Sequence, residues 1–493
     1  MRAEPSERLA LFLRANDEEE AGRRYPGLLR ALVSGGKSRP GASEAAREMA
    51  GQVLTVPAER SGHLVVLLGL LAECGEPELR RNIRAGLDHY LKLLGTVREN
   101  TPLGAALVYL LAHFPEDAAS ILPVARSGFL DQDDLSRLER CLAVFTPETP
   151  AIGRSWPSPA RWRLSDAERD HERRWLTTLT RDAVVAFWEK DTRTLLAYMG
   201  AKAAAAISTR QVESEAPDEI LPVRAPQATG RTSALFDKYA PLFRCPACGG
   251  RLVRRGTAIT CRDCAAGYLT DEGYLDLSGT APGAGDQIAG NSPLYLSRYE
   301  PLLRPAFLRV NGTNWSGAVS IADEDAYLID HVRPAAGPLL DLGAGTGRWT
   351  KVLASHLGGE RIIAFDLAAA MVRRLGEVVP DSLVMRGAAG NLPFADGTLG
   401  AVNCWNTIQS IETPYQTIHE IGRCLGRGGT FTMLTYRHSP DPLYRYFQQR
   451  HESCLGVTSF DPEEMREALS KAGMTVMDQY TPGSFLIITA VRR

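Results

Sequence analysis

Apolar residues recur at helical spacing through the first 146 residues of the chain. Apolar positions three or four residues apart give a helix one face to bury. The clearest stripes are Leu79, Ile83, Leu87, Tyr90 and Leu94; Leu103, Leu107, Leu110, Leu111 and Phe114; and Leu135, Leu138, Leu142 and Phe145. Glycines and prolines such as Gly75, Pro102 and Pro115 interrupt the pattern at short intervals. We therefore expect residues 1–146 to form a repeat-like array or a bundle of helices.

The last third of the chain alternates short apolar runs with amphipathic stretches. Alternation of strands and helices is typical of a doubly wound α/β layer with a largely parallel sheet. Candidate strands cover 339–342, 361–365, 382–385, 401–405 and 430–435, and two later ones at 475–479 and 485–491 flank a Thr-Pro-Gly turn. The pattern thus predicts five parallel strands followed by a hairpin.

Stretches rich in proline and glycine separate these regions and mark the expected boundaries. We expect residues 147–232 to be a linker with one helical segment, 240–280 to be a small cysteine-containing module, 281–337 to be a connector, and 338–493 to be the α/β domain.

Composition narrows the class of protein. Of 493 residues, 44% are hydrophobic and 23% are charged, which is ordinary for a globular chain. The net charge of −2 gives no overall attraction to nucleic acid. The longest apolar run, 64–71, is too short to cross a bilayer, and the N-terminus lacks the apolar core of a signal peptide. We therefore expect a cytoplasmic protein without a membrane segment.

Residues 341–347 read Asp-Leu-Gly-Ala-Gly-Thr-Gly and follow the first of these strands. Glycine is needed where the backbone bends sharply or touches a ligand. The dinucleotide signature G-x-G-x-x-G does not fit, because Arg348 or Thr350 occupies its third glycine position. The tighter G-x-G-x-G after an acid resembles motif I of the class I S-adenosylmethionine (SAM) methyltransferases. This resemblance implies a Rossmann-like, seven-stranded domain that binds SAM.

The resemblance also implies where SAM is held. Asp366 ends the second strand, nineteen residues after Gly347, where a carboxylate can accept hydrogen bonds from both ribose hydroxyls. Residues 387–394 are similar to the G-D-A-x-x-L-P-F element of ubiquinone-biosynthesis methyltransferases, but Ala388 replaces the aspartate that contacts adenine. That contact must then come from the backbone, from Asn391 or not at all. The implied SAM-binding residues are Asp341, Gly343, Ala344, Gly345, Gly347, Asp366, Leu367, Met371, Ala388, Ala389 and Asn406.

The fourth strand ends beside the expected position of the methyl group. Residues 408–411 are Ile-Gln-Ser-Ile, where many relatives carry Leu-His-His-Ile. Trp405, Asn406 and Gln409 are then candidate substrate contacts, and the two amides are too weakly basic to remove a proton. A base is needed only if the acceptor must lose a proton. The candidates are His438, Tyr436 and Glu412, each with a structural alternative as a loop, pocket-wall or helix-cap residue.

Four cysteines follow the spacing C-x2-C-x12-C-x2-C at Cys245, Cys248, Cys261 and Cys264. Two such knuckles present four thiolates, which complete the tetrahedral shell of a zinc ion. A site without an open position is structural, and the ion would fold a segment too small for a core of its own. We interpret the arginines around the cysteines as a solvated face, with a nucleic-acid patch as the alternative.

Residues 268–277 are similar to the sequence that follows the cysteines in zinc-ribbon rRNA guanine-N1 methyltransferases and in a related group of bacterial and plastid methyltransferases. Residues 292–300 and 304–307 are similar to the connector of that second group. The resemblance covers about 240–493 and implies that the connector forms a lid over the donor pocket. The candidate lid residues are Tyr295, Arg298 and Tyr299.

Three functions agree with these patterns. We favour methyl transfer from SAM to a small-molecule or peptide acceptor in a biosynthetic pathway, with the helical module recruiting a protein or peptide partner. The zinc ribbon and its arginines support an RNA methyltransferase of the guanine-N1 kind as the alternative. Because Ala388 replaces the aspartate and the two histidines are missing, a third possibility is a catalytically degenerate protein that binds SAM and serves as an interaction protein.

Overall fold

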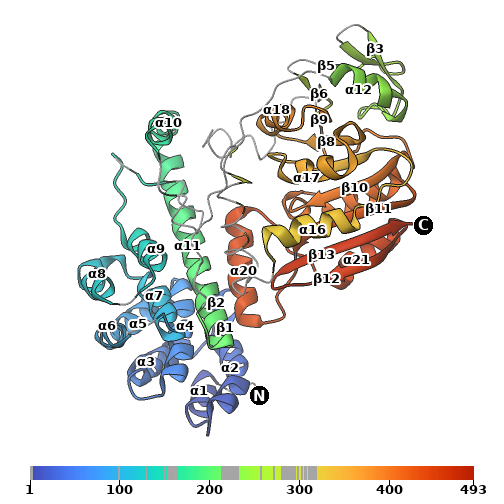
Figure 1. Ribbon diagram of the computed structural model, residues 1–493. Helices are drawn as coiled ribbons and strands as arrows, with labels where there is room; N and C mark the ends of the chain where they lie inside the picture. Colours follow the sequence, from blue (N-terminus) through green and yellow to red (C-terminus); the bar gives the residue numbers. More distant parts are fainter. Residues whose placement is uncertain are drawn as a thin grey trace. The chain divides into compact units, whose positions relative to one another are not determined.

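The computed structural model of the chain divides into two compact units (Figure 1). The helical unit consists of Met1–Arg163, Leu176–Ala216 and Ser439–Gly456, and the sheet unit of Leu164–Trp175, Pro217–His438 and Val457–Arg493. The structure describes residues 4–97, 100–128, 130–148, 150–152, 162, 165–212, 232–255, 258–269, 273–278, 296, 299–300, 304, 308 and 319–493.

Short helices make up most of the helical unit, as the apolar stripes predict. They are α1 (Pro5–Leu13), α2 (Glu18–Leu32), α3 (Ala42–Gln52), α4 (Ala58–Glu73), α5 (Pro77–Arg84), α6 (Leu87–Thr96), α7 (Pro102–Leu111), α8 (Ala118–Ser127), α9 (Gln132–Leu142), α11 (Arg181–Thr209) and α20 (Pro442–Leu455). A small hairpin, β1 (Val33–Ser34) with β2 (Lys37–Ser38), follows α2 and was not expected from the sequence. Helix α10 (Asp166–Leu176) lies at the boundary that separates the units along the chain.

The core of the helical unit is built on α4 and α7. Both helices are apolar almost all round, which is typical of a helix covered on every side. They approach closely at Gly69, where an added Cβ would lie 2.5 Å from a ring carbon of Tyr109. Thr101 caps α7 by accepting a hydrogen bond from the backbone N–H of Gly104 at 3.2 Å.

Two helices far apart in the sequence complete this unit. Helix α11 begins after the capping residue Thr180, and α20 begins after Asp441, whose carboxylate accepts hydrogen bonds from two backbone N–H groups of the first turn. The ring of Phe447 on α20 meets Tyr109 edge-on, with centroids 5.3 Å apart. Residues 439–456 lie within the range expected for the α/β domain, yet they pack as a core helix of the helical unit.

The sheet unit contains the predicted strands. They are β7 (Leu339–Leu342), β8 (Ile362–Asp366), β9 (Leu383–Arg386), β10 (Leu399–Trp405), β11 (Leu425–Tyr436), β12 (Met474–Tyr480) and β13 (Phe485–Arg492). Their order is β12-β13-β11-β10-β7-β8-β9, with neighbours parallel from β11 to β9 and antiparallel at β13. This is the seven-stranded arrangement that the glycine motif predicted.

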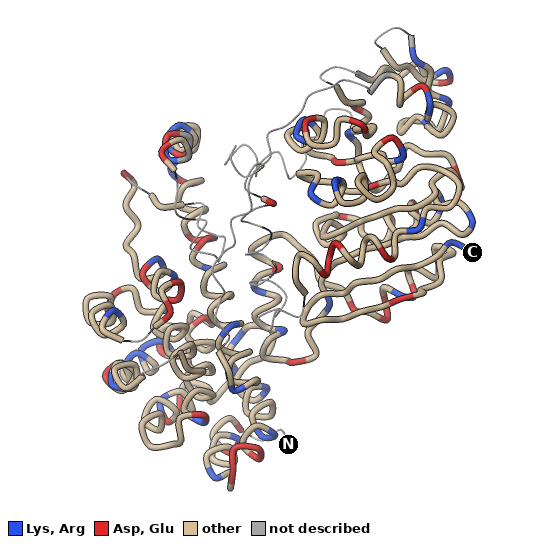
Figure 2. The backbone as a smooth tube through the Cα atoms, viewed as in Figure 1, with Lys and Arg blue, Asp and Glu red and all other residues tan. Residues whose placement is uncertain are grey.

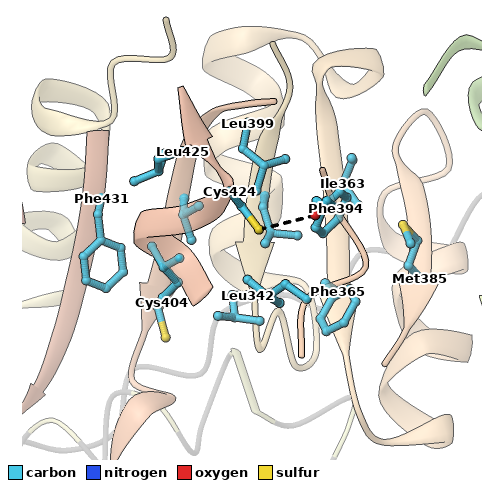
Figure 3. Close-up of a cluster of buried hydrophobic side chains, with 14 of the residues drawn as sticks. Leu342, Ile363, Phe365, Met385, Phe394, Leu399, Cys404, Cys424, Leu425 and Phe431 are labelled. Carbon is cyan, nitrogen blue, oxygen red and sulfur yellow. Dashed lines mark hydrogen bonds between the residues drawn. The ribbon is translucent and has the colours of Figure 1, made fainter. Parts of the chain in front are cut away.

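Helices cover both faces of this sheet. On one face α12 (Thr232–Tyr239), α19 (Pro414–Cys424) and α21 (Pro462–Lys471) share one apolar core with Leu340 and Leu342. Figure 3 shows part of this core around Leu342, Phe365 and Phe394. On the other face α16 (Ile321–His331) and α17 (Arg348–Leu357) pack on Leu339, and α18 (Ala369–Val378) packs beside them. Successive residues of β7 therefore point to opposite faces, and both are buried.

The cysteine module extends the same sheet. Its strands are β3 (Leu252–Arg255), β4 (Ala258–Cys261), β5 (Gly267–Leu269) and β6 (Leu275–Asp276). Strand β6 pairs in parallel with β9, with Leu275 opposite Met385. Strands β5, β4 and β3 follow β6 in the sheet, which therefore has eleven strands. The sequence predicted the module but not its fusion with the sheet.

Among the described residues, no single helix has the length and apolar character needed to cross a bilayer. The helices at Pro102–Leu111 and Pro115–Ser127 meet the length and composition criteria only as a pair, and that pair is bent by 99°.

Candidate functional site

The glycine turn lies at the carboxyl end of β7, where ligands bind in sheets of this type. Gly343, Gly345 and Gly347 have φ values of 72°, 56° and 85°, a region that residues with side chains rarely adopt. A Cβ on Gly343 would lie 2.1 Å from Thr407, so this glycine is needed for packing. A Cβ on Gly345 would meet only a backbone oxygen at 3.9 Å, so this position opens onto free space that a ligand can approach.

Asp366 faces the same turn from the end of β8. One carboxylate oxygen accepts the backbone N–H of Gly345 at 2.9 Å, and the other accepts that of Ala368, also at 2.9 Å. A carboxylate offers about four acceptor positions, which is more than these two backbone donors use. The backbone bonds hold the carboxylate beside the open position at Gly345, as a ribose-binding acid requires.

Asp341 lies behind the turn instead of facing that open space. Its side chain is buried and accepts hydrogen bonds from Thr350 Oγ1 at 2.5 Å and Asn403 Nδ2 at 2.8 Å. Burial raises the pKa of Asp341 to about 6, although these two donors act in the opposite direction. In this arrangement Asp341 ties β7 to α17 and β10, and thereby supports the glycine turn.

The predicted adenine side of the site is partly open. Met371 is buried on α18, Leu367 and Ala389 are half-buried, and Ala388 is exposed. Asn391, which was one possible source of an adenine contact, donates its amide to the carbonyl of Pro246 at 2.7 Å. Residues 387–394 are therefore attached to the cysteine module next to them.

Neutral side chains form the edge where the acceptor would lie. Asn406 has a left-handed φ of 53° and accepts a hydrogen bond from Gln409 Nε2 at 3.1 Å. Gln409 in turn accepts one from Thr435 at 3.1 Å. The side chains of Tyr299 and Asn406 are also hydrogen-bonded, and burial raises the pKa of the Tyr299 hydroxyl. The structure thus brings Tyr299, a candidate lid residue, together with Asn406 and Gln409.

A buried ion pair supports this edge, and the sequence did not reveal it. Arg304 Nε donates to Glu324 Oε2 at 3.1 Å, and the indole of Trp405 donates to Glu324 Oε1 at 2.7 Å. All three side chains are essentially inaccessible, so Trp405 lies in the core. Burial opposes the charge of Arg304, but the Glu324 carboxylate raises its pKa overall.

The Arg-Pro-x-Phe motif was the available sequence signal for this ion pair, because a charged residue in a motif suggests a fixed partner. The other candidate lid residues, Tyr295 and Arg298, lie outside the described residues.

The three candidate bases occupy different environments. His438 is half-buried just past β11, and its backbone N–H donates to the carbonyl of Phe460 at 2.8 Å. Tyr436 is half-buried at the end of β11 and its ring stacks on Phe485, with centroids 5.9 Å apart. Glu412 is exposed in the segment between β10 and α19.

The four cysteine thiols converge as the spacing predicted. Their sulfur atoms all lie within 4.8 Å of one another. Cys245 and Cys264 sulfurs are 3.7 Å apart, and those of Cys248 and Cys261 are 3.5 Å apart. Tetrahedral thiolates bound to zinc at about 2.3 Å would be separated by about 3.8 Å. The donor set and its spacing therefore fit a tetrahedral zinc ion.

Nearby groups are placed to stabilise thiolates. The Tyr268 hydroxyl lies 3.0 Å from Cys245 Sγ, and the backbone N–H groups of Gly250 and Asp263 donate to the sulfurs of Cys248 and Cys261 at 3.4 and 3.3 Å. Such outer contacts orient metal ligands.

The sheet order, the glycine turn after β7 and the acid at the end of β8 together define a class I SAM-dependent methyltransferase domain. Residues 340–433 match the methyltransferase domain family. The chain therefore contains a class I SAM-dependent methyltransferase domain, joined to a four-cysteine cluster and a helical N-terminal region.

Relatives of known sequence carry the same domain. An uncharacterized chloroplastic methyltransferase of Arabidopsis thaliana is 26% identical over 319 residues, which are 57% of this chain and 88% of the relative. A 2-phytyl-1,4-naphtoquinone methyltransferase of Thermosynechococcus vestitus is 29% identical over 24% of this chain and 53% of its own length. A malonyl-[acyl-carrier protein] O-methyltransferase of Laribacter hongkongensis is 28% identical over 36% of this chain and 65% of its own length.

Among solved structures, geranyl diphosphate C-methyltransferase from Streptomyces coelicolor is similar to 35% of this chain and 77% of its own length. The sequence identity is 19% and the TM-score is 0.31.

Proposed function

We propose that this protein transfers the methyl group of SAM to a small-molecule or peptide acceptor in a biosynthetic pathway. The observation that carries the proposal is the open position at Gly345 beside the carboxylate of Asp366. Backbone without a side chain leaves room for the nucleoside and methionine parts of SAM, and the fixed carboxylate accepts the ribose hydroxyls.

The acceptor edge suits a reaction that depends on alignment. When bound, SAM supplies a methyl group already activated by its sulfonium charge. Asn406, Gln409 and Tyr299 form a connected set of neutral hydrogen-bonding groups that can orient an acceptor. Orientation of two reacting groups can contribute roughly 7–11 kcal/mol. For an acceptor that must lose a proton, His438 is our candidate base because it follows β11, whose Leu434 carbonyl binds the backbone N–H of Asn406.

Further features favour a small-molecule or peptide acceptor. Relatives named above include a methyltransferase of a naphtoquinone and one of malonyl-[acyl-carrier protein]. Figure 2 shows basic and acidic residues interspersed along the elements of each unit, and Arg254 of the cysteine module pairs with Asp237 at 2.9 Å. A solvated face explains such arginines better than an RNA-binding patch does.

The test begins with SAM binding measured by calorimetry on the full chain. We expect Gly345→Val to abolish binding, because its side chain would enter the open space, whereas Gly376→Ala on α18, with nothing within 4 Å of its Cβ, leaves binding unchanged. Absence of SAM binding by the wild-type chain would refute the proposal and support the degenerate alternative.

Methyl-labelled SAM then distinguishes the acceptor classes. We expect label to appear in small organic molecules or peptides after incubation with fractionated cell extract. Label that appears only in RNA, with affinity that falls steeply as salt rises, would instead establish the guanine-N1 alternative.

A further inference from the structure

A pocket of about 880 Å³ lies in the helical unit. Its lining residues are far in the sequence from those of the methyltransferase domain. Its walls come from the start of α1, the second half of α2, β1 and the segment just before α3, all drawn in blue in Figure 1. Ligand pockets in proteins typically enclose about 300–1,000 Å³, so this one has room for an organic molecule.

Glycines bring the walls together. The guanidinium of Arg8 on α1 lies over Gly27 of α2, with Nη1 3.7 Å from the position of a Cβ there. Gly41, with a left-handed φ of 84°, lets the start of α3 approach Pro5, where a Cβ would lie 3.3 Å from the ring. Arg39 is fixed between α2 and α3, because its N–H donates to the Leu32 carbonyl at 2.8 Å and its carbonyl accepts the N–H of Ala42 at 3.0 Å.

The pocket is lined by arginines that form no ion pair with any described residue. Arg8, Arg30 and Arg39 all line it, and Glu4 is the one carboxylate among its lining residues. Within the described part of the chain, no carboxylate oxygen lies within 4.0 Å of these guanidinium groups. Arg39 Nε is buried and has no hydrogen-bond acceptor among the described residues. A buried donor left unpaired is costly, and an anion in the pocket would satisfy it.

Two other arginines of the helical unit, one on α2 and one on α4, have carboxylate partners. Arg23 pairs with Glu19 at 2.6 Å, and Arg60 of α4 pairs with Glu18 at 2.9 Å. These two ion pairs contrast with Arg8, Arg30 and Arg39, which have no carboxylate within 4.0 Å among the described residues.

Two helix ends add to the positive potential. The residues before α1 and α3, Glu4 and Gly41, give no side-chain cap to the first-turn N–H groups. Free N–H groups and the helix dipole favour an anion at such ends. Three guanidinium groups and one carboxylate leave a net charge of about +2, which matches a phosphate monoester at about −1.5 to −2 near pH 7 better than it matches a single carboxylate.

We propose that this pocket binds a phosphorylated small molecule, with its phosphate held by Arg8, Arg30 and Arg39 and its organic part in the remaining volume. This site is separate from the SAM site in the chain and does not depend on the proposed transfer reaction.

The experiment compares probes by calorimetry on the full chain: inorganic phosphate, ribose 5-phosphate, phenyl phosphate and ribose. We expect saturable binding of at least one phosphate ester, at least tenfold tighter than inorganic phosphate, and no binding of ribose. Arg30→Gln and Arg39→Gln should each weaken that binding at least tenfold, while Arg23→Gln on the same helix as Arg30 leaves it unchanged.

Circular dichroism and thermal unfolding of each variant show whether the helical unit is intact. SAM affinity, measured on the same sample, keeps a failure of this proposal distinct from a failure of the proposed function. Absence of saturable binding of either ester would overturn the proposal, as would binding that survives in the Arg30→Gln, Arg39→Gln double variant. Equal affinity for inorganic phosphate and both esters would show that the organic part is not recognised, which also contradicts it.

Discussion

The ring of Phe447 of α20 lies directly against the backbone of Gly200 on α11. A Cβ at Gly200 would be 2.2 Å from a ring carbon of Phe447, closer than any side chain allows. The two residues are 247 positions apart in the chain, since 447 minus 200 is 247. This contact fixes a helix from the C-terminal half of the sequence in the core of the helical unit. The chain leaves the sheet unit after His438 and re-enters it at Val457.

We predict that Gly200→Ala destabilises the helical unit by roughly 1–3 kcal/mol, because the added methyl group forces Phe447 or the helices apart. The effect should be visible as a lower unfolding temperature in calorimetry. Gly22→Ala on α2 is the matched control, because nothing lies within 4 Å of its Cβ. Alanine there should be neutral or stabilise by up to about 1 kcal/mol. Equal effects of the two substitutions would contradict the close contact.

Glu324→Gln should destabilise the sheet unit by about 3–5 kcal/mol, because it leaves the charge of the buried Arg304 without its counterion. The double variant Glu324→Gln, Arg304→Met should recover part of this loss, since no buried charge remains. Denaturant unfolding followed by the fluorescence of Trp405 and the other tryptophans measures both. A single variant as stable as the wild type would show that the pair is solvated.

Zinc should be present at about one equivalent per chain and should be lost in Cys261→Ser, together with solubility. Elemental analysis measures the metal, and Cys454→Ser, a cysteine outside the cluster, is the control. Because Asn391 anchors the 387–394 segment to Pro246 of the first knuckle, we expect chelation of zinc to weaken SAM binding as well. Full zinc content in Cys261→Ser would contradict the assignment of the ligands.

Asp366→Ala should weaken SAM binding more than tenfold while the fold persists, because the ribose hydroxyls lose their acceptor. Asp330→Asn, an exposed carboxylate on α16, should leave the affinity unchanged. Calorimetric titration gives both affinities, and circular dichroism checks the fold. An unchanged affinity in Asp366→Ala would remove the ribose assignment.

The helical unit should lose stability as the pH falls. Burial lowers the pKa of His451 on α20 from 6.5 to about 4, and its Nε2 is buried without an acceptor among the described residues. The unfolded chain therefore takes up this proton first, and the free energy of unfolding falls between about pH 6.5 and 4, by roughly 1–3 kcal/mol. Burial lowers the pKa of His63 as well, with the same sign.

Thermal unfolding at several pH values measures this dependence, and His451→Leu should make it shallower. A variant with the same pH dependence as the wild type would assign the effect to other groups.

Local pattern was enough to predict much of the methyltransferase domain. Strand β7 was predicted at its observed bounds, and the others to within a few residues. This was possible because the pattern of alternate or successive apolar residues within a short segment indicates a buried strand. The glycines of the turn and the spacing of the cysteines were equally local signals, since each reflects a requirement of the backbone or of one metal ion.

The sequence by itself thus determined most of the helices and strands, the position of the glycine turn after β7, and which thiols meet. Only the tertiary structure decided that α20 belongs to the helical unit and that Asp341 points away from the open side of the turn. It also decided that three arginines, without an ion pair among the described residues, share a pocket. The physical reason is that the periodicity of a segment shows that one of its faces must be buried, but does not show against what. The partner of that face, or of a charged side chain, comes from residues that can lie hundreds of positions away in the sequence.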